Sequence, residues 1–425
     1  MKTIVQKILF WLARLILQHH QPDIIAVTGS VGKTSTKQAI ATVLASKFSV
    51  RASAENYNNE FGLPLTIIGA ISGGRNPLRW LGIILKGMAY GLLPLPYPNI
   101  LVLEMGIDHP GDMKYLTTLA PPHVAVVTAI GSEPVHVQFF RDVDHLAQEK
   151  FTIYKRLKKH DWAIVNNDEP YTARYTPTIK AQLMTIGIQQ SADLRAEEVR
   201  YTYHANQTGV NFKLRYQGSV VPVFIPGVVG IPPVYAALIA ATVGTIYGMN
   251  LVAITAALQQ YQAPNGRMRL IAGQDHSIII DDSYNASPLA VQQALRVLQT
   301  LPLSGQRLAC LGDMRELGRY AKRAHTAIGK LVAELNIDFL VTVGEEAKAI
   351  AQGAQAYGLP SDRIQAVTHS TEAITVLQHH LKPGDIILVK GSQGVRLEKV
   401  VKALMAEPAR ASELLVRQHG HWTTL

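Results

Sequence analysis

The stretch IIAVTGSVGKTS, residues 24–35, decides the fold. Its apolar first half predicts a buried strand, its small residues predict a tight turn, and the region from Lys33 to about Leu44 predicts a helix. Glycines in such a turn allow backbone N–H groups to face an anion at the helix N-terminus. Lys33 can then reach the outer phosphates of a nucleotide, and the Thr34 hydroxyl can ligate Mg²⁺. We interpret the stretch as a phosphate-binding loop rather than as an ordinary strand-to-helix turn.

The composition narrows the class of protein. The chain has 425 residues, 48% hydrophobic and 17% charged, with a formal net charge of +10. These values predict two or three well-packed domains and an anionic partner such as a nucleotide or a membrane surface. We expect no nucleic-acid partner, because the sequence contains no helix-turn-helix, ribonucleoprotein motif or zinc-ligand spacing. The lone Cys310 cannot form an intrachain disulfide, which is typical of a reducing compartment, so we expect a cytoplasmic protein.

The first 23 residues predict an amphipathic helix. Apolar residues recur at helical spacing from Ile4 to Leu15, but Lys7 and Arg14 interrupt the run of about 20 apolar residues that a membrane span needs. Residues 75–98 form a second apolar and basic stretch. The two segments can pack on each other and on the first domain, or both can touch the inner face of the membrane.

The rest of the chain predicts an α/β fold with two domains. Short apolar runs alternate with helical segments, which is typical of a mostly parallel sheet with helices on both faces. Residues 201–224 alternate as antiparallel strands do, and the turn APNG at residues 263–266 is the best domain boundary. We therefore expect an N-terminal helix, a central nucleotide-binding domain and a C-terminal Rossmann-like α/β domain, at residues 1–23, 24–262 and 263–425. The runs expected as strands are residues 24–28, 100–103, 124–128, 163–165, 278–281, 308–311, 339–343 and 386–389.

A carboxylate is expected beside the phosphate loop. Glu104 directly follows the predicted strand at residues 100–103, at the edge where open α/β sheets bind ligands. Mg²⁺ prefers carboxylate, hydroxyl and phosphate oxygens. Thr34 and Glu104 could therefore hold one Mg²⁺ beside bound ATP.

Several motifs resemble those of the Mur ligase superfamily. They are TGSVGKTS at 28–35, NYNNEFGLPLT at 56–66, DDSYNASP at 281–288, LGDMRELG at 311–318 and KGS at 390–392. Within the superfamily they are most similar to the type that adds D-alanyl-D-alanine, and the resemblance extends from Ile24 to Leu404. It implies a P-loop Mur-ligase central domain and a monomeric, ADP-forming ligase of peptidoglycan synthesis, hence of cell shape and cell division. The implied cofactors are ATP and Mg²⁺, and the implied substrates are a UDP-MurNAc-peptide and D-alanyl-D-alanine.

The resemblance also implies roles for individual residues. Lys33, Glu104, His136, Lys150 and Arg267 are expected to be catalytic, with Thr34, Glu104 and His136 holding metal. Lys150 matches a lysine that CO₂ carbamylates, so that it helps to position a second Mg²⁺. The expected ATP contacts are Gly29, Ser30, Val31, Gly32, Lys33, Thr34, Ser35, Arg267, Asp282, Tyr284 and Asn285. The expected substrate contacts are Asn58, Asn59, Asp313, Glu316, Lys390 and Ser392.

Two departures from the family pattern keep alternatives open. Pro232 and Ala236 replace polar residues of the segment that contacts the adenine side in the family, so base recognition must be looser or come from elsewhere. Only residues 1–23 precede the first strand, so we expect no separate N-terminal domain for the UDP end of the substrate. The alternatives are another amide ligase of the superfamily, of the folylpolyglutamate or cyanophycin type, and a nucleotide-binding regulatory subunit without turnover.

Overall fold

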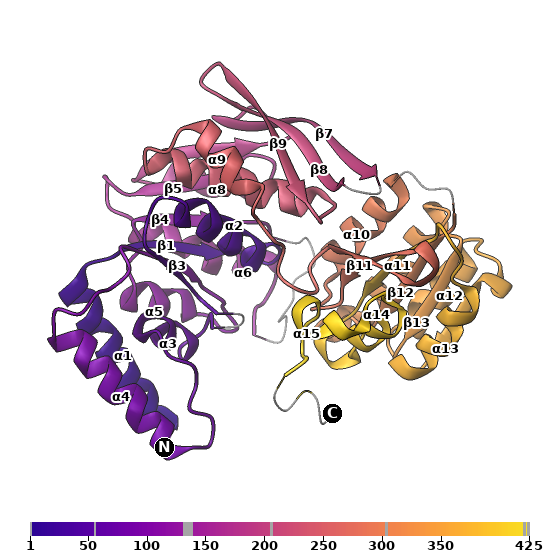
Figure 1. The fold of residues 1–425 in the computed structure, drawn as a ribbon, viewed down its shortest axis with the longest axis horizontal. Helices are drawn as coiled ribbons and strands as arrows, with labels where there is room; N and C mark the ends of the chain where they lie inside the picture. Colours follow the sequence, from indigo (N-terminus) through magenta and orange to yellow (C-terminus); the bar gives the residue numbers. More distant parts are fainter. Residues whose placement is uncertain are drawn as a thin grey trace.

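The computed structural model describes residues 2–54, 57–130, 139–204, 207–301, 305–419 and 422. Within these residues the chain forms a nine-stranded and a six-stranded sheet, each covered by helices (Figure 1). The predicted α/β fold, with a mostly parallel first sheet and a second α/β unit, is confirmed.

The first sheet is parallel over most of its width. Its strand order is β2 (Val50–Ala52), β3 (Ile100–Glu104), β1 (Asp23–Thr28), β4 (Val124–Val127), β5 (Trp162–Asn166), β6 (Gln182–Gly187), β7 (Leu194–His204), β8 (Gln207–Tyr216) and β9 (Ser219–Pro226). The strands from β2 to β7 are parallel, and β7, β8 and β9 pair antiparallel. The predicted antiparallel addition is therefore present at one edge of the sheet.

Helices cover both faces of this sheet. Successive side chains of a strand point to opposite faces, so Ile25 and Val27 of β1 enter one core while Ile24 and Ala26 enter the other. The first core includes α2 (Lys33–Ala45), α8 (Ile231–Ile246) and α9 (Leu251–Leu258). The second includes α1 (Lys2–His20), α3 (Gly62–Ile68), α4 (Pro77–Leu92), α5 (Asp112–Leu119) and α6 (Val143–Phe151), and the short α7 (Thr172–Tyr175) packs beside it. Burial on both faces explains why β1 reads as an uninterrupted apolar run.

The second sheet is a smaller parallel sheet with one antiparallel edge strand. Its order is β10 (Arg269–Ala272), β11 (Ile278–Asp282), β15 (Ile386–Lys390), β12 (Arg307–Gly312), β13 (Phe339–Val343) and β14 (Ile364–Val367), and only β10 pairs antiparallel with its neighbour. One face packs against α10 (Pro288–Thr300), α11 (Ala321–Glu334) and α12 (Lys348–Ala356). The other packs against α13 (Ser370–His380), α14 (Glu398–Leu404) and α15 (Ala411–Leu414). Cys310 is a buried free thiol in β12.

The connection between the sheets runs from α9 to β10. The expected boundary at residues 262 and 263 falls within it, and we propose it as the division between the two domains. The helix expected at the N-terminus is present as α1, which lies beside α4 at the periphery of the first domain (Figure 1). In the part of the chain that the structure describes, no helix is long and apolar enough to cross a membrane.

Candidate active site

The phosphate loop lies between β1 and α2, where the sequence predicts it. Gly29 and Gly32 have φ angles of 144° and 87°, a region that residues with a Cβ rarely adopt. A Cβ added to Gly29 would lie 2.0 Å from Thr128 Oγ1, so only glycine fits there. The Ser30 N–H donates to the Ala129 carbonyl at 2.7 Å, and Thr128 Oγ1 donates to the Val31 carbonyl at the same distance. The end of β4 therefore fixes the shape of the loop.

Lys33 reaches back over the loop from the first turn of α2. Its Nζ donates to the carbonyl oxygens of Gly29 and Ser30 at 2.8 and 3.4 Å. Burial lowers the pKa of Lys33; the Glu104 carboxylate acts in the opposite direction, and Arg267 lowers the pKa further. The ammonium thus lies where the outer phosphates of a nucleotide would need a cation, and Thr34 follows it in the same turn.

Glu104 is a buried carboxylate at the end of β3. It pairs in register with Val27, so it lies directly beside the start of the phosphate loop. Its Oε1 accepts from Asn58 Nδ2 at 3.2 Å, and its Oε2 lies 3.6 Å from Lys37 Nζ. Burial alone would raise the pKa of Glu104, but the charges of Lys33 and Lys37 outweigh it and hold that pKa below the ordinary value. Glu104 is therefore ionised.

Lys150 joins α6 to the phosphate loop. The side chain is buried, and its Nζ donates to the Gly29 carbonyl at 3.1 Å. Burial, and next the charge of Lys33, lower the pKa of Lys150 well below that of an ordinary lysine, although Asp108 and Glu149 act in the opposite direction. A lowered pKa increases the share of neutral amine, which is the form that can react as a nucleophile.

The second domain contributes a cation and a polar loop to the same space. The Arg267 guanidinium lies 4.2 Å from the centre of the Tyr284 ring and is close enough to influence the pKa of both Lys33 and Glu104. Lys390 Nζ donates to Asp282 Oδ2 at 2.5 Å and to the Asn285 carbonyl at 3.0 Å. The loop after β11 is therefore attached to the end of β15.

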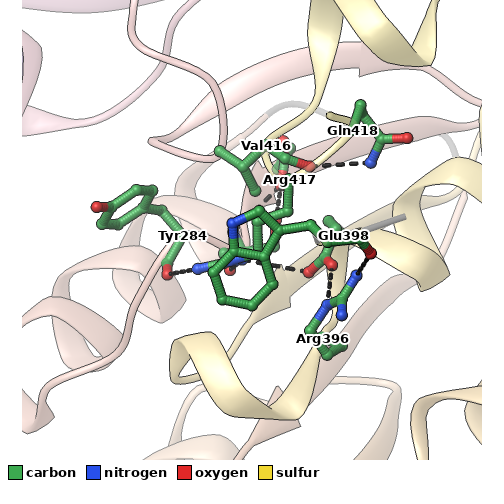
Figure 2. A network of polar contacts seen from close by, with 9 residues as sticks. Tyr284, Arg396, Glu398, Val416, Arg417 and Gln418 are labelled. Atoms are coloured by element: carbon green, nitrogen blue, oxygen red, sulfur yellow. Dashed lines mark hydrogen bonds and ion pairs between the residues drawn. The ribbon is translucent and has the colours of Figure 1, made fainter. Parts of the chain in front are cut away.

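Arg417 holds this loop from the C-terminal side. Its guanidinium donates to the Tyr284 carbonyl at 2.6 Å and to Glu398 Oε2 at 3.2 Å, and it lies 5.4 Å from the centre of the Tyr284 ring (Figure 2). Arg396 forms a second ion pair with the fully buried Glu398. Tyr284 therefore has an arginine of the nucleotide site, Arg267, and a supporting arginine, Arg417, against the same ring.

A cavity of about 450 Å³ between the domains brings most of the predicted residues together. The predicted residues that line it are Gly29, Ser30, Val31, Gly32, Lys33, Ser35, Asn58, Asn59, Glu104, Lys150, Arg267, Asp282, Tyr284, Asn285, Glu316 and Lys390. Pro232 and Pro233, at the start of α8, form an apolar part of the wall. Another cavity, of about 400 Å³ near Arg14 and His123, contains none of the predicted residues.

Of the predicted residues that the structure describes, three do not line this cavity: Thr34, Asp313 and Ser392. His136 lies outside the described residues. Thr34 adjoins the cavity through its neighbours in α2. Asp313 Oδ1 accepts from the Ala347 N–H at 2.9 Å, and Ser392 Oγ accepts from the Arg315 N–H at 2.9 Å. The side chains of Asp313 and Ser392 thus support loops around β12 and β15.

Some residues near the site were not predicted from the sequence. Lys37 lies one helical turn after Lys33, and this spacing of four residues could have indicated a second cation on the same face of the helix. Asp108 influences the pKa of both Lys33 and Lys150, and its place just beyond Glu104 was the available signal. Arg417 is far from every motif, and no local pattern marks it.

The donor set fits Mg²⁺ better than a metal enclosed by protein ligands. Among the described residues there is no group of three or more His, Cys, Asp or Glu side chains that could hold a metal ion. In the same part of the chain Glu104 Oε2 is buried without a hydrogen-bond partner. Mg²⁺ keeps several waters and is commonly bound by one or two carboxylates together with substrate phosphates. One carboxylate beside a phosphate loop meets that requirement.

Comparison with known proteins agrees with this geometry. Residues 27–73 and 95–244 match the Mur ligase middle domain, and residues 266–393 match the Mur ligase, glutamate ligase domain. The chain belongs to the Mur ligase family. It is 30% identical over 397 residues to the UDP-N-acetylmuramoyl-tripeptide–D-alanyl-D-alanine ligase of Bacillus subtilis, covering 93% of this chain and 79% of the relative. The Escherichia coli ligase of the same name is 28% identical over 395 residues, covering 92% and 79%.

Solved structures show the same similarity. The MurF ligase of Thermotoga maritima in complex with ADP superposes with a TM-score of 0.78 at 26% identity, covering 96% of this chain and 84% of that one. A MurF crystal structure from Acinetobacter baumannii gives a TM-score of 0.76 at 27% identity, covering 92% and 79%.

Proposed function

We propose that this chain is an ATP-dependent, ADP-forming ligase of peptidoglycan precursor synthesis, which joins D-alanyl-D-alanine to the peptide of a UDP-MurNAc-tripeptide. The observation that carries the proposal is one cavity shared by a phosphate loop, the buried carboxylate of Glu104 and an arginine of the second domain, Arg267. A site divided between two domains can close around its reactants and exclude water. The names of the Bacillus subtilis and Escherichia coli relatives support the choice of substrates.

The chemistry follows from the poor reactivity of a carboxylate. A peptide carboxylate oxygen attacks the γ-phosphorus of ATP, the bond to the β–γ bridging oxygen breaks, and ADP leaves an acyl phosphate. The amine of D-alanyl-D-alanine then attacks the acyl carbon, the carbon–oxygen bond to phosphate breaks, and the amine loses a proton. The products are the amide, ADP and inorganic phosphate. Catalysis in such transfers is mainly positioning and charge stabilisation.

The charged residues of the cavity have roles in that scheme. Lys33 and Arg267 would balance the negative charge that develops on the transferring phosphoryl group. Thr34, Glu104 and His136 are the proposed metal-holding residues, and Mg²⁺ bound there would neutralise phosphate charge. The buried carboxylate oxygen of Glu104 without a hydrogen-bond partner supports this assignment.

We also propose that Lys150 is carbamylated. Carbamylation joins the carbon of CO₂ to the neutral amine nitrogen, which loses a proton and becomes an anionic carbamate. The burial of Lys150 and its depressed pKa support the reaction, because a neutral amine is required. The carbamate would place an anion beside Lys33 and help to position a second Mg²⁺.

The remaining lining residues divide between nucleotide and peptide. We assign Asp282, Tyr284 and Asn285 to the nucleotide, with apolar contact to the base from Pro232 and Pro233. The candidate contacts for the peptide and D-alanyl-D-alanine are Asn58, Asn59, Glu316 and Lys390. Asp313 and Ser392 are assigned to the support of the loops that carry these residues. We propose a monomer, and a peripheral membrane contact through α1 and α4.

Phosphate release from ATP tests the substrate assignment. The purified chain is incubated with MgATP and a UDP-MurNAc-tripeptide, with D-alanyl-D-alanine, L-glutamate or no amine added. We expect rapid release only with D-alanyl-D-alanine, and a product heavier by the dipeptide less one water. Release that depends on glutamate would favour a folylpolyglutamate-type ligase, and binding of ATP without release in any mixture would favour a regulatory subunit.

A further inference from the structure

Helix α4 has an apolar stripe that faces solvent. Leu78, Leu81, Leu85, Met88 and Leu92 recur at intervals of three and four residues, so they share one face of the helix. Their side chains are between 39% and 76% exposed. A helix of a water-facing domain ordinarily turns such a stripe toward its core. The stripe is therefore apolar surface that the described part of the molecule does not cover.

The opposite face of α4 already packs on α1. A Cβ added to Gly87 would lie 3.0 Å from the Leu12 side chain, and one added to Gly91 would lie 2.6 Å from Leu15. Residue numbers rise in the same direction along both helices from one contact to the next, so the helices are parallel. Figure 1 shows them side by side at the periphery of the first domain. The stripe is thus additional to the face that attaches α4 to the protein.

Helix α1 and the loops beside α4 extend the exposed apolar surface. Ile4, Ile8 and Trp11 of α1 are 64%, 36% and 68% exposed, and Ile71, before α4, is 81% exposed. Most of the exposed large hydrophobic side chains among the described residues lie in α1 or in residues 71–95. We refer to Ile4, Ile8, Trp11 and the five stripe residues of α4 as the α1–α4 surface. An exposed apolar area of this kind on a monomer usually marks an interaction site.

The two segments that carry this surface have charged residues of one sign only. Residues 1–22 and 61–103 contain no Asp or Glu at all. The same two segments contain the basic residues Lys2, Lys7, Arg14, Arg75, Arg79 and Lys86. Apolar side chains together with cations, without a single carboxylate, are typical of helices that lie in the interface of an anionic membrane, and tryptophan favours that depth. The residues around α4, 74–94, also lie outside the match to the Mur ligase middle domain.

We propose that the α1–α4 surface docks this protein on an anionic lipid bilayer, with both helices lying in the plane of the membrane surface. The apolar side chains enter the boundary between headgroups and acyl chains, and the flanking cations contact lipid phosphates. The cavity between the domains is lined by neither helix, so it stays outside the contact. Docking would hold the enzyme at the surface without a spanning helix.

Vesicle flotation of the full chain tests the proposal. Vesicles of phosphatidylglycerol and phosphatidylcholine in equal parts are compared with pure phosphatidylcholine, for the wild type and for Leu81→Ser/Leu85→Ser. The matched control is Val252→Ser, which changes a 70% exposed apolar residue of α9. We expect wild type and control to float with the anionic vesicles, and the double variant to bind at least about tenfold more weakly, a change of about 1.4 kcal/mol. Thermal unfolding checks that each variant is folded.

Three results would overturn the proposal. The first is wild-type protein that does not bind the anionic vesicles. The second is a folded double variant that binds as tightly as wild type. The third is a wild-type dimer, detected by analytical ultracentrifugation without lipid, that the double variant does not form, together with no binding to vesicles. The surface would then join two copies of the chain. Because turnover is not the readout, failure here leaves the ligase proposal untouched.

Discussion

Lys150 donates a hydrogen bond from Nζ to the carbonyl oxygen of Gly29 across 3.1 Å, although 121 residues separate the two along the chain. The contact brings a buried amine to the first residue of the phosphate loop. Lys33 donates to the same carbonyl at 2.8 Å, so two lysines converge on one oxygen. Burial lowers the pKa of Lys150 most, and repulsion from the nearby Lys33 ammonium lowers it further.

Replacement of Lys150 by alanine should nearly abolish turnover, because an uncharged methyl group cannot become a carbamate. We expect a loss of at least about a hundredfold, partly restored by short carboxylates, which can occupy the space that the side chain leaves. Lys155→Ala, at an exposed position five residues later, is the matched control and should retain activity. The carbamate assignment would be wrong if the alanine variant were active and mass spectrometry found no CO₂ adduct on the wild type at high bicarbonate.

Replacement of Lys33 by alanine should separate catalysis from stability. Burial of the Lys33 ammonium costs free energy in the folded state, as its lowered pKa indicates. Removal of this ammonium should therefore leave the melting temperature of the protein unchanged or raise it. Turnover should fall by roughly a hundred- to a thousandfold, as for the loss of a preorganised transition-state contact. Steady-state kinetics and thermal melts are compared with those of the exposed-site variant Lys47→Ala. A folded Lys33→Ala protein with normal turnover would remove Lys33 from the mechanism.

Replacement of Arg417 by methionine should weaken nucleotide binding. The change removes the hydrogen bond to the Tyr284 carbonyl that holds the loop under Arg267. We expect KM for ATP to rise about tenfold with a smaller change in kcat, since the reacting groups themselves remain. Arg410→Met removes an exposed arginine that pairs with Glu413 and should alter neither constant. Equal losses in kcat and in kcat/KM for Arg417→Met would contradict a positioning role.

The stability of the second domain should depend on Asp281. Burial raises the pKa of this carboxyl to about 6 from the ordinary 3.8, despite hydrogen bonds from Ser283. Between about pH 4 and pH 6 the folded state keeps a proton that the unfolded state has lost. The free energy of unfolding therefore falls as the pH rises through this range and levels off above about pH 6. The total loss is on the order of 3 kcal/mol. Asp281→Asn lacks this titration. Denaturant unfolding measures the free energy of unfolding at about pH 5 and pH 7.5. Its fall between these two pH values should be larger for the wild type than for Asp281→Asn. Equal falls would show that the pKa of Asp281 has its ordinary value.

Much of the fold was predictable because buried parallel strands are short apolar runs. The expected strands at residues 24–28, 278–281 and 339–343 agree closely with β1, β11 and β13. Strands β2, β6 and β14 were not predicted, since each is partly exposed and carries polar side chains. The apolar stripe of α4 could not be assigned to a face from the sequence, because the helix is apolar on two sides.

The site was predictable where residues follow the ends of strands. Parallel strands bring their carboxyl ends to one edge, so the phosphate loop and Glu104 were expected to meet, and they do. Arg267 lies in the same cavity because of the way the domains pack, which no local pattern determines. The roles of Lys37 and Arg417 depend on contacts with residues 67 and 133 positions away, so only the folded chain reveals them.

Transfer of one labelled oxygen atom tests the ligase account most directly. The acceptor peptide is prepared with oxygen-18 in its terminal carboxylate and incubated with MgATP, D-alanyl-D-alanine and the enzyme. Attack of the carboxylate on the γ-phosphorus carries one labelled oxygen into the phosphate that leaves when the amide forms. We therefore predict that mass spectrometry will find one oxygen-18 in each inorganic phosphate released, in step with amide formation. Amide formation with unlabelled phosphate, or with the label in AMP, would contradict an acyl-phosphate intermediate and the function proposed for this site.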